Sequence, residues 1–197
     1  NQNINKMIKE YNGSAHYIIG KIYYQGDIVK KDIEKALYYL KSASLLNDSE
    51  AQFTLALIYY SGYVCKIDIN LAIKYFTMSA NQNHRDALFF LGLIYYEGKY
   101  VKQNINKAMD LFIQLANQKS PESQYKLGMI YFEGIYAEKN INKAIHYLSL
   151  AANQNYKDAL KILAHIYGAG KLVPIDLNRV INYLSNDVFK NNPLINF

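Results

Sequence analysis

Four histidines and one cysteine are the residues of this chain best suited to metal binding or nucleophilic chemistry. They are His16, His84, His146, His165 and Cys65. Zinc sites built from short motifs place two ligands within a few residues of each other, whereas these residues are spread along the chain. Cys65 stands where a small apolar residue would pack in a turn. We therefore predict no metal site, no cofactor and no catalytic residue.

Motifs of several enzyme classes are also missing. The chain has no Gly-x-Ser-x-Gly elbow, no Walker loop and no dinucleotide-binding glycine fingerprint. Eight of its ten glycines follow a long-range periodicity that needs no bound phosphate to explain it. The chain is accordingly predicted not to be an enzyme.

Composition and charge further limit the kinds of protein that this chain can be. The chain has 197 residues, of which 51% are apolar and 19% are charged, which is enough apolar material for a buried core. The net charge is +6, but its only arginines are Arg85 and Arg179, and the lysines are scattered, so nucleic-acid binding is not expected. No apolar run approaches the roughly 20 residues of a membrane span. A single cysteine favours the cytoplasm over secretion, although a removed leader stays possible and the compartment stays open.

A repeat of 36 residues organises the whole chain. The aligned columns contain Ala15, Ala51, Ala87, Ser123 and Ala159; Gly20, Ala56, Gly92, Gly128 and Ala164; Tyr23, Tyr59, Tyr95, Tyr131 and Tyr167; Gly26, Gly62, Gly98, Gly134 and Gly170; Asp32, Asp68, Asn104, Asn140 and Asp176; and Ala36, Ala72, Ala108, Ala144 and Val180. Five copies in register without insertions indicate a repeat protein.

Each column has a physical role in a pair of helices. Apolar residues at helical spacing between Ala15 and Gln25 predict a first helix, in which the small residues allow a neighbouring helix to approach. Gly26 and its equivalents suit the left-handed residue that ends this helix. Asp32 and its equivalents are preferred N-caps, and they predict the start of a second helix.

These observations predict an all-α fold: a right-handed α-solenoid of about five 36-residue helix–turn–helix repeats. The repeats occupy residues 15–188 and start near residues 15, 51, 87, 123 and 159. Residues 1–14 are predicted to form an N-terminal capping segment. The apolar C-terminal tail, residues 189–197, is expected to fold back as a cap.

The repeat resembles the Sel-one-like repeat (SLR) family, a relative of the tetratricopeptide repeats, over about residues 15–188. The third and fourth copies carry the resemblance best, at Ala87, Leu91, Gly92, Tyr95, Gly98, Val101, Lys107, Ala108 and Ala116, and at Leu127, Gly128, Tyr131, Gly134, Lys143, Ala144, Ala151 and Ala152. Two departures stand out. The glycine expected after the second helix is replaced by Asn47, Asn83, Lys119 and Asn155. The paired cysteines of a secreted bacterial branch are missing.

The resemblance implies a non-enzymatic adaptor or scaffold that binds protein partners. Helical geometry then predicts the residues that line a concave groove formed by the first helices. The predicted partner-binding residues are Tyr24, Tyr60, Tyr96, Phe132, Leu57, Leu93, Met129, Phe90, Lys126 and Lys161. The rings at Tyr60, Tyr96 and Phe132 are expected to be exposed. A groove of this character suits an amphipathic helix or an extended apolar peptide.

Two alternatives stay open. Because some relatives of this fold have been linked to β-lactams, one is a hydrolase acting on β-lactams, which requires an activated serine beside a base. The other is a self-associating structural protein, in which the tail from Pro193 to Phe197 enters a neighbouring copy's groove. A homo-oligomer is therefore possible.

Overall fold

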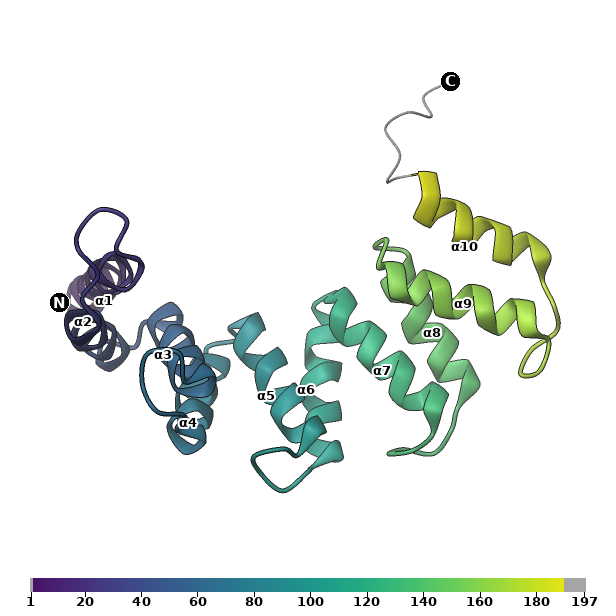
Figure 1. Ribbon diagram of the computed structural model, residues 1–197, viewed down its shortest axis with the longest axis horizontal. Helices are drawn as coiled ribbons and strands as arrows, with labels where there is room; N and C mark the ends of the chain where they lie inside the picture. The colour runs from purple at the N-terminus through teal and green to yellow at the C-terminus, as the bar shows by residue number, and fades with distance from the viewer. Residues whose placement is uncertain (1, 190–197) are drawn as a thin grey trace. The chain divides into compact units, whose positions relative to one another are not determined.

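The computed structural model describes the backbone of residues 2–189 and the side chains of residues 12–185. This described part contains ten α-helices and no strand (Figure 1). The helices are α1 (Gln2–Gln25), α2 (Ile33–Leu45), α3 (Ser49–Ser61), α4 (Ile69–Ala80), α5 (Arg85–Glu97), α6 (Ile105–Asn117), α7 (Pro121–Glu133), α8 (Ile141–Ala152), α9 (Lys157–Ala169) and α10 (Leu177–Phe189). The predicted all-α array of helix-pair repeats is confirmed.

The chain divides into two compact units, Asn1–Gln103 and Asn104–Phe197. Within the first unit, each helix from α1 to α5 packs against the next one along the chain. The same holds within the second unit from α6 to α10. The boundary between the units falls in the loop between the two helices of the third repeat.

The predicted N-caps are confirmed at the start of every second helix. In each case the side-chain oxygen accepts a hydrogen bond from the backbone N–H three residues later. The five bonds are Lys35 N–H to Asp32 at 3.0 Å, Leu71 to Asp68 at 2.9 Å, Lys107 to Asn104 at 3.0 Å, Lys143 to Asn140 at 3.0 Å and Arg179 to Asp176 at 3.1 Å. Both Asp and Asn work because the cap needs only an acceptor oxygen.

Left-handed residues end both helices of a repeat. Gly98, at the end of α5, has a φ angle of 64°, and the other glycines of its column also have positive φ angles. The turns between repeats place Asn47, Asn83, Lys119 and Asn155 at φ 61–66°. The structure thus confirms that these residues take the position where the resemblance led us to expect glycine. Three of the four are Asn, which tolerates this backbone better than most residues.

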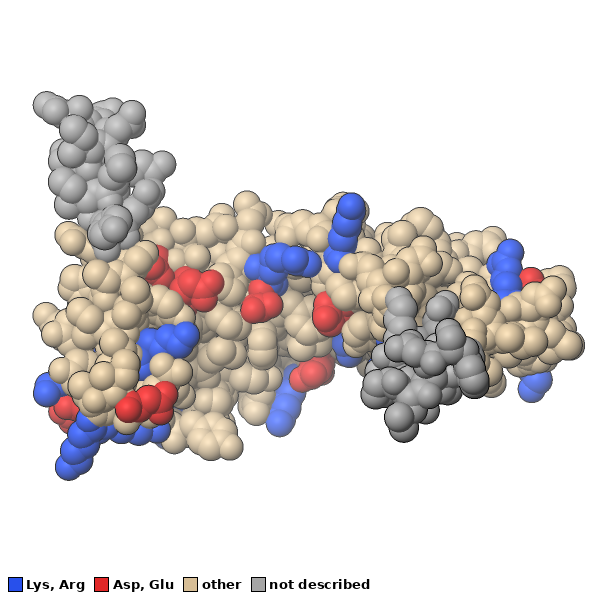
Figure 2. All heavy atoms as spheres, turned by 90° about the horizontal axis from the view of Figure 1, so that it is seen from above, with Lys and Arg blue, Asp and Glu red and all other residues tan. Residues whose placement is uncertain are grey.

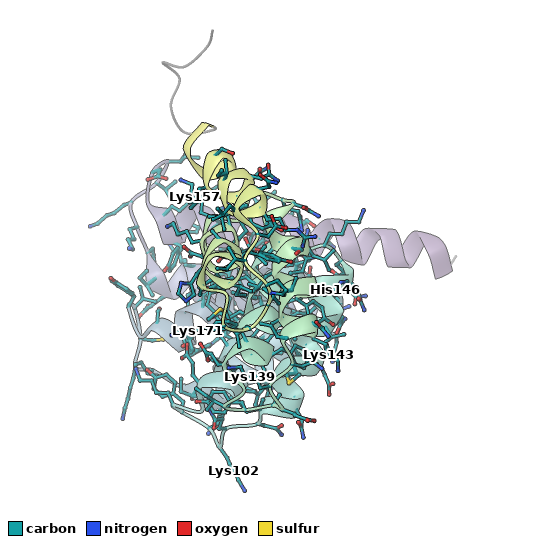
Figure 3. All side chains as sticks on the ribbon, turned by 90° about the vertical axis from the view of Figure 1, so that its right-hand side faces the viewer. Lys102, Lys139, Lys143, His146, Lys157 and Lys171 are labelled. Atoms are coloured by element: carbon teal, nitrogen blue, oxygen red, sulfur yellow. The ribbon has the colours of Figure 1, made fainter. Side chains whose placement is uncertain are left out.

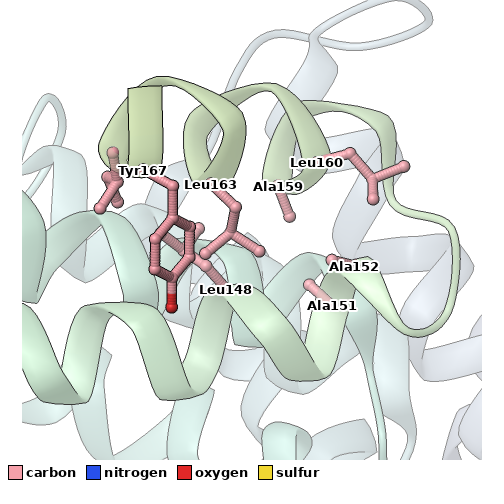
Figure 4. Packing of buried hydrophobic residues seen from close by; sticks show 8 residues of the cluster. Leu148, Ala151, Ala152, Ala159, Leu160, Leu163 and Tyr167 are labelled. Carbon is pink, nitrogen blue, oxygen red and sulfur yellow. The ribbon is translucent and has the colours of Figure 1, made fainter. Parts of the chain in front are cut away.

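The core repeats along each unit. Leu40, Phe76, Phe112 and Leu148 occupy the same position of successive second helices, and all are fully buried. At Gly128 the helices of one repeat come so close that an added Cβ would lie 2.6 Å from Leu148 Cγ. Across the next boundary, α8 and α9 share one buried cluster in which Leu148 packs with Ala159 and Leu163 (Figure 4).

Stacked tyrosines join the two helices of most repeats. The pairs with their ring-centroid separations are Tyr23 and Tyr39 at 6.0 Å, Tyr59 and Tyr75 at 5.9 Å, Tyr131 and Tyr147 at 6.0 Å, and Tyr167 and Tyr183 at 6.2 Å. The third repeat has Leu111 in the second position. This stacking accounts for the tyrosine column found in the sequence.

The first repeat differs from the prediction. Helix α1 begins at Gln2, so the backbone of the segment predicted as a cap is continuous with the first helix of the repeat. Ala15 is exposed, whereas Ala51, Ala87, Ser123 and Ala159 are fully buried. The predicted packing role of this column is therefore wrong for Ala15, since no described helix packs on α1 as the preceding second helices pack on α3, α5, α7 and α9. Of the predicted C-terminal cap, residues 189–197, Phe189 is the last residue of α10, and 190–197 lie outside the described residues.

We predict that Asp68→Ala lowers the free energy of unfolding by about 1 kcal/mol, because it leaves the Leu71 N–H without its capping acceptor. Asp68→Asn keeps an acceptor oxygen and is expected to change the stability little. Urea unfolding followed by circular dichroism measures both. Equal losses for the two variants would show that the negative charge matters and the cap does not.

We further predict that Gly98→Ala destabilises the chain by about 1 kcal/mol or more, since an L-residue is strained at this backbone conformation. The new Cβ would also lie 2.5 Å from Gln103 Cβ. The matched control is Gly168→Ala near the end of α9, where the nearest atom, Val180 Cγ2, would be 3.6 Å away. The control should be neutral or stabilising. Equal unfolding midpoints for the two variants would refute the backbone argument.

Candidate partner-binding surface

Rings from three successive helices form a cluster in the first unit. Phe76 of α4 is fully buried and forms its floor. Phe90 of α5 stacks on Phe76 with ring centroids 5.4 Å apart and planes 7° apart. Phe53 of α3 lies 5.9 Å from Phe76 and 5.8 Å from Phe90. Through these three ring contacts, the second repeat packs against the first helix of the third repeat.

Tyr60 extends this cluster toward solvent. Its ring lies 6.2 Å from Phe76 and 6.3 Å from Phe90, edge-on to both. On the outer side it meets Tyr100, at 6.0 Å, whose side chain is 41% exposed. We call Phe53, Tyr60, Phe90 and Tyr100 the α3–α5 aromatic surface.

Charge at the margin of this surface is balanced. Burial raises the pKa of the Tyr60 hydroxyl above its ordinary value, and the negative charge of Glu97 raises it further. The ammonium group of Lys99 lies 4.9 Å from the centroid of the Tyr100 ring. A hydrogen bond to Tyr100 raises the pKa of Lys99. The margin of this aromatic surface thus carries one carboxylate, of Glu97, and one ammonium group, of Lys99.

The predicted groove residues of the first unit are less accessible than expected. Tyr60 and Tyr96 are half-buried, so the prediction of an exposed ladder is wrong in that respect. The other predicted residues of this unit are also half-buried: Tyr24, Leu57, Phe90 and Leu93. For Tyr60 the cause is the cluster of rings, which covers part of its side chain. The structure brings Tyr60 and Phe90 into edge-on contact, with ring centroids 6.3 Å apart.

In the second unit the predicted residues lie on α7 and α9. Phe132 is half-buried, packs against the buried cluster of α8 and α9, and has the Lys139 ammonium 5.8 Å from its ring centroid. Met129 and Lys126 are half-buried as well. Lys161 is exposed and lies 3.7 Å from Asp158. Phe132 was expected to be exposed, and packing against its neighbours again accounts for the difference.

Positive charge is spread over the surface. On the face shown in Figure 2, acidic and basic side chains lie interspersed. Lys102 projects away from the ribbon (Figure 3), whereas Lys143 lies 5.0 Å from the centroid of the Tyr131 ring. This distribution agrees with the expectation drawn from the scattered lysines of the sequence.

The sequence reasoning missed a set of exposed apolar residues in the loops that follow the first helices. The set is Ile28, Val29, Tyr63, Ile67, Tyr100, Ile135, Tyr136, Leu172 and Ile175. A signal was present, because Ile28, Val64, Tyr100, Tyr136 and Leu172 form one more column at the repeat spacing. Tyr100 of this column extends the α3–α5 aromatic surface.

Two of the residues considered for metal binding or nucleophilic chemistry, His84 and Cys65, take part in packing and hydrogen bonding. His84 Nδ1 accepts a hydrogen bond from the Ala87 N–H at the start of α5, and its ring stacks on Phe53 at 4.6 Å. Cys65 is half-buried, with its sulfur 3.9 Å from the Ile58 carbonyl oxygen. Within the described residues, no group of three histidine, cysteine or acidic side chains is placed to hold a metal ion.

Sequence reasoning also missed the Ser-x-x-Lys spacing of serine β-lactamases, which occurs at Ser123 and Lys126. Ser123 is fully buried in α7, and its hydroxyl accepts a hydrogen bond from the Ser120 hydroxyl at 3.2 Å. A nucleophile must reach its substrate. The geometry of this pair therefore gives no support to the β-lactam alternative.

Comparison with known families identifies the repeat. Residues 13–48, 49–84, 85–120 and 121–156 each match the Sel1 repeat. The chain belongs to the Sel1 repeat family. Sel1 repeat proteins generally mediate protein–protein interactions, and they are typically interaction scaffolds rather than enzymes. None of the curated proteins compared with the chain matches it significantly. No helix among the described residues is long and apolar enough to cross a membrane.

Solved structures of other Sel1 repeat proteins resemble this one. A Sel1 repeat protein from Oxalobacter formigenes is 28% identical with a TM-score of 0.78, over 91% of this chain and 74% of that one. The protective antigen c5321 of uropathogenic Escherichia coli is 26% identical with a TM-score of 0.84, and the match covers 91% of this chain but only 38% of the antigen. Helicobacter pylori cysteine-rich protein B is 27% identical with a TM-score of 0.51, over 70% and 98% of the two chains. Unlike that cysteine-rich protein, this Sel1 repeat chain contains a single cysteine.

We predict a tyrosine contribution to the pH dependence of stability. Because burial raises the pKa of Tyr60 in the folded chain, its stabilising effect is complete below the unfolded value of about 10 and is lost as the pH rises through the folded value. Tyr60→Phe should therefore lose less stability than the wild type between about pH 8 and about pH 11. Urea midpoints at the two pH values provide the measurement. The control is Tyr38→Phe, at a side chain that is 66% exposed. If the Tyr60 and Tyr38 variants follow the same pH profile, the assignment fails.

Proposed function

We propose that this Sel1 repeat chain is a scaffold that binds an apolar peptide or an amphipathic helix at the α3–α5 aromatic surface. The observation that supports this most is the arrangement of Tyr60 and Tyr100. Both rings offer accessible area, and Tyr60 is held from behind by Phe76 and Phe90. A ring already held in place loses little conformational entropy when a partner binds.

The chemistry of the surface determines the kind of partner. Aromatic side chains that are part apolar and part polar are the commonest anchors of protein interfaces. A helix that presents apolar residues along one face would cover Tyr60 and Phe90 with these residues. Its polar margin would meet Glu97 and Lys99. An extended apolar peptide is the other form of partner that fits the same rings.

The second unit carries its own proposed contact, formed by Phe132, Met129, Lys126 and Lys161. Lys126, Met129 and Phe132 follow one another at three-residue intervals on α7, and Lys161 of α9 is exposed. This composition suits a peptide that combines apolar and acidic residues. The two proposed contacts are argued separately, each from the residues of its own unit.

The proposal is tested with amphipathic helical peptides selected from a displayed library on the wild-type chain. We predict that Tyr60→Ala and Tyr100→Ala each weaken binding of the selected peptides by about 2 kcal/mol, as loss of an aromatic anchor does. Tyr38→Ala, in which an exposed tyrosine of α2 is lost, is the matched control and should bind as the wild type does. Isothermal titration calorimetry gives the three affinities.

Thermal melts accompany the binding measurement, since Tyr60 is half-buried. Tyr60→Ala should cost about 1–2 kcal/mol of stability, less than the 3–5 kcal/mol that removal of a core ring costs. Tyr100→Ala should melt close to the wild type. Peptides that bind all three variants equally would show that the partner uses another face. A core-sized loss of stability for Tyr60→Ala would assign that ring to packing alone.

A further inference from the structure

The loops that join the first helix to the second carry exposed apolar side chains in two successive repeats. They are residues 62–67, between α3 and α4, and residues 98–103, between α5 and α6 (Figure 1). In the first of these loops Tyr63 is 89% exposed and Ile67 is 46% exposed. In the second loop Tyr100 is 41% exposed. Both loops belong to the first unit of the chain.

The two loops lie side by side. The ring of Tyr100, in the second loop, contacts the ring of Tyr60 at 6.0 Å, and the first loop starts at Gly62, two residues after Tyr60. This neighbourhood follows from the repeat, because both loops leave the C-terminal end of a first helix and successive repeats stack on each other. We call residues 62–67 and 98–103 together the lysine–tyrosine edge.

Lysines are the only charged residues within the lysine–tyrosine edge. Lys66, Lys99 and Lys102 are all exposed, and Lys102 projects away from the ribbon (Figure 3). Half of the net charge of +6 therefore comes from these two loops. The flanking acidic residues are Glu97, just before the second loop, and Asp68, whose carboxylate caps the start of α4.

The same combination recurs in the equivalent loop of the first repeat, residues 26–31. There Ile28 is 78% exposed, and Lys30 and Lys31 follow it against one acidic residue, Asp27. Exposed apolar side chains next to lysines are thus a property of this loop in each of the first three repeats. A composition that recurs in this way is a feature of the edge as a whole.

The way in which Tyr63 is exposed indicates the kind of partner. Its side chain projects with almost all of its area open to solvent, whereas Tyr60 is held from behind by Phe76 and Phe90. A protein partner gains most from a ring that is already held in place. A lipid bilayer is fluid and surrounds a projecting side chain without a preformed pocket. Tyrosine also favours the membrane–water interface, because its ring is apolar and its hydroxyl is polar.

The lysines add charge complementarity to this preference. Basic side chains beside a membrane-facing apolar residue are attracted by the negative surface potential of anionic lipids. Lys66 lies three residues after Tyr63 in the same loop, and Lys99 and Lys102 lie in the adjacent loop. An anionic bilayer therefore satisfies the apolar and the charged residues of the edge together.

We propose that the lysine–tyrosine edge binds the surface of a bilayer that contains anionic lipids. Tyr63 and Ile67 enter the interfacial region, and the ammonium groups of the three lysines lie among the headgroups. The inference is independent of the proposed peptide site, which is built on Tyr60. Tyr100 is shared between the two surfaces, and the membrane contact does not require it.

The proposal implies a graded and salt-dependent affinity. Each lysine near an anionic surface strengthens binding about fivefold, which corresponds to about 1 kcal/mol. Salt screens this attraction. Binding is therefore expected to weaken strongly between about 50 mM and about 500 mM NaCl, where the Debye length shortens several-fold.

The experiment is co-sedimentation of the 197-residue chain with lipid vesicles. Vesicles of phosphatidylcholine with roughly 30% phosphatidylserine should bind the chain, and vesicles of phosphatidylcholine alone should bind it far more weakly. Lys66→Gln combined with Lys102→Gln should weaken binding about 25-fold. The matched control is Lys41→Gln combined with Lys74→Gln, which removes the same charge from exposed lysines of α2 and α4. Equal weakening by the two pairs would show that binding follows net charge alone and would overturn the proposal.

A fluorescent reporter tests insertion directly. The chain contains no tryptophan, so Tyr63→Trp introduces a single indole at the proposed contact. Its emission should move to shorter wavelength when the anionic vesicles are added. Tyr38→Trp, at a side chain of α2 that is 66% exposed, is the control and should keep its emission unchanged. A bound chain in which the indole at position 63 shows no shift would overturn insertion at this edge.

Two further arms separate this proposal from other partners. An acidic protein surface is the competing partner, and poly-L-glutamate is its probe. A chain that binds poly-L-glutamate but not the anionic vesicles would overturn the proposal. In the second arm, Tyr63→Ala should weaken vesicle binding, and Tyr60→Ala, which removes the anchor of the peptide site, should leave it unchanged. Equal loss of vesicle binding in these two variants would assign the contact to the α3–α5 aromatic surface and would also overturn the proposal. Circular dichroism confirms that all variants are folded.

Discussion

One side chain in each of the second helices α2, α4, α6 and α8 is buried from two directions, and the rest of the fold depends on it. Within a repeat, Leu40 lies against Gly20, so closely that an added Cβ would be 2.9 Å from Leu40 Cγ. Across a boundary, its equivalent Leu148 packs into the first helix of the next repeat. Neither contact alone would bury the side chain completely. A single repeat therefore cannot cover its own apolar residues, and its stability comes from the neighbours on both sides.

The parts of the fold that sequence reasoning predicted are those decided within a few residues. The cap at Asp68 needs only an oxygen three residues before a free N–H, and the helix end at Gly98 needs only a permissive backbone. Buried polar pairs are harder to predict. Gln52 and Gln124 are buried, and each accepts a hydrogen bond at 2.8 Å from a glutamine 30 residues later in the chain. The partners belong to different helices, and no local rule joins them.

In the candidate surface too, features decided locally could be predicted and contacts between repeats could not. The 36-residue period placed Tyr60 among the predicted groove residues, with its ring exposed. Its half-burial could not be predicted, because that depends on Phe90 and Tyr100 from the following repeat. Ala15 illustrates the converse. Its sequence position matches a buried column, yet it is exposed because burial at this position requires a preceding repeat.

Aromatic content distinguishes one stretch of the array from another without changing its fold. Phe76 occupies the position that Leu40 and Leu148 fill in other repeats, and the ring allows a stack with Phe90. The equivalent of Phe90 two repeats later is Ile162, which has no ring to form such a stack. Packing positions that accept either a ring or an aliphatic side chain thus allow a local binding surface to arise while the backbone register stays the same.

Within each unit, the packing of each helix on its neighbour in the chain has a kinetic consequence. To bring such neighbours together, the chain closes only a short loop, so little entropy is lost before the contact forms. Chains dominated by such local contacts fold faster than those that pair distant segments. Folding can begin in any adjacent pair of helices and spread from there. Opening of the chain is expected to start at helices that have a neighbour on one side only, and amide hydrogens near the middle of each unit should exchange last.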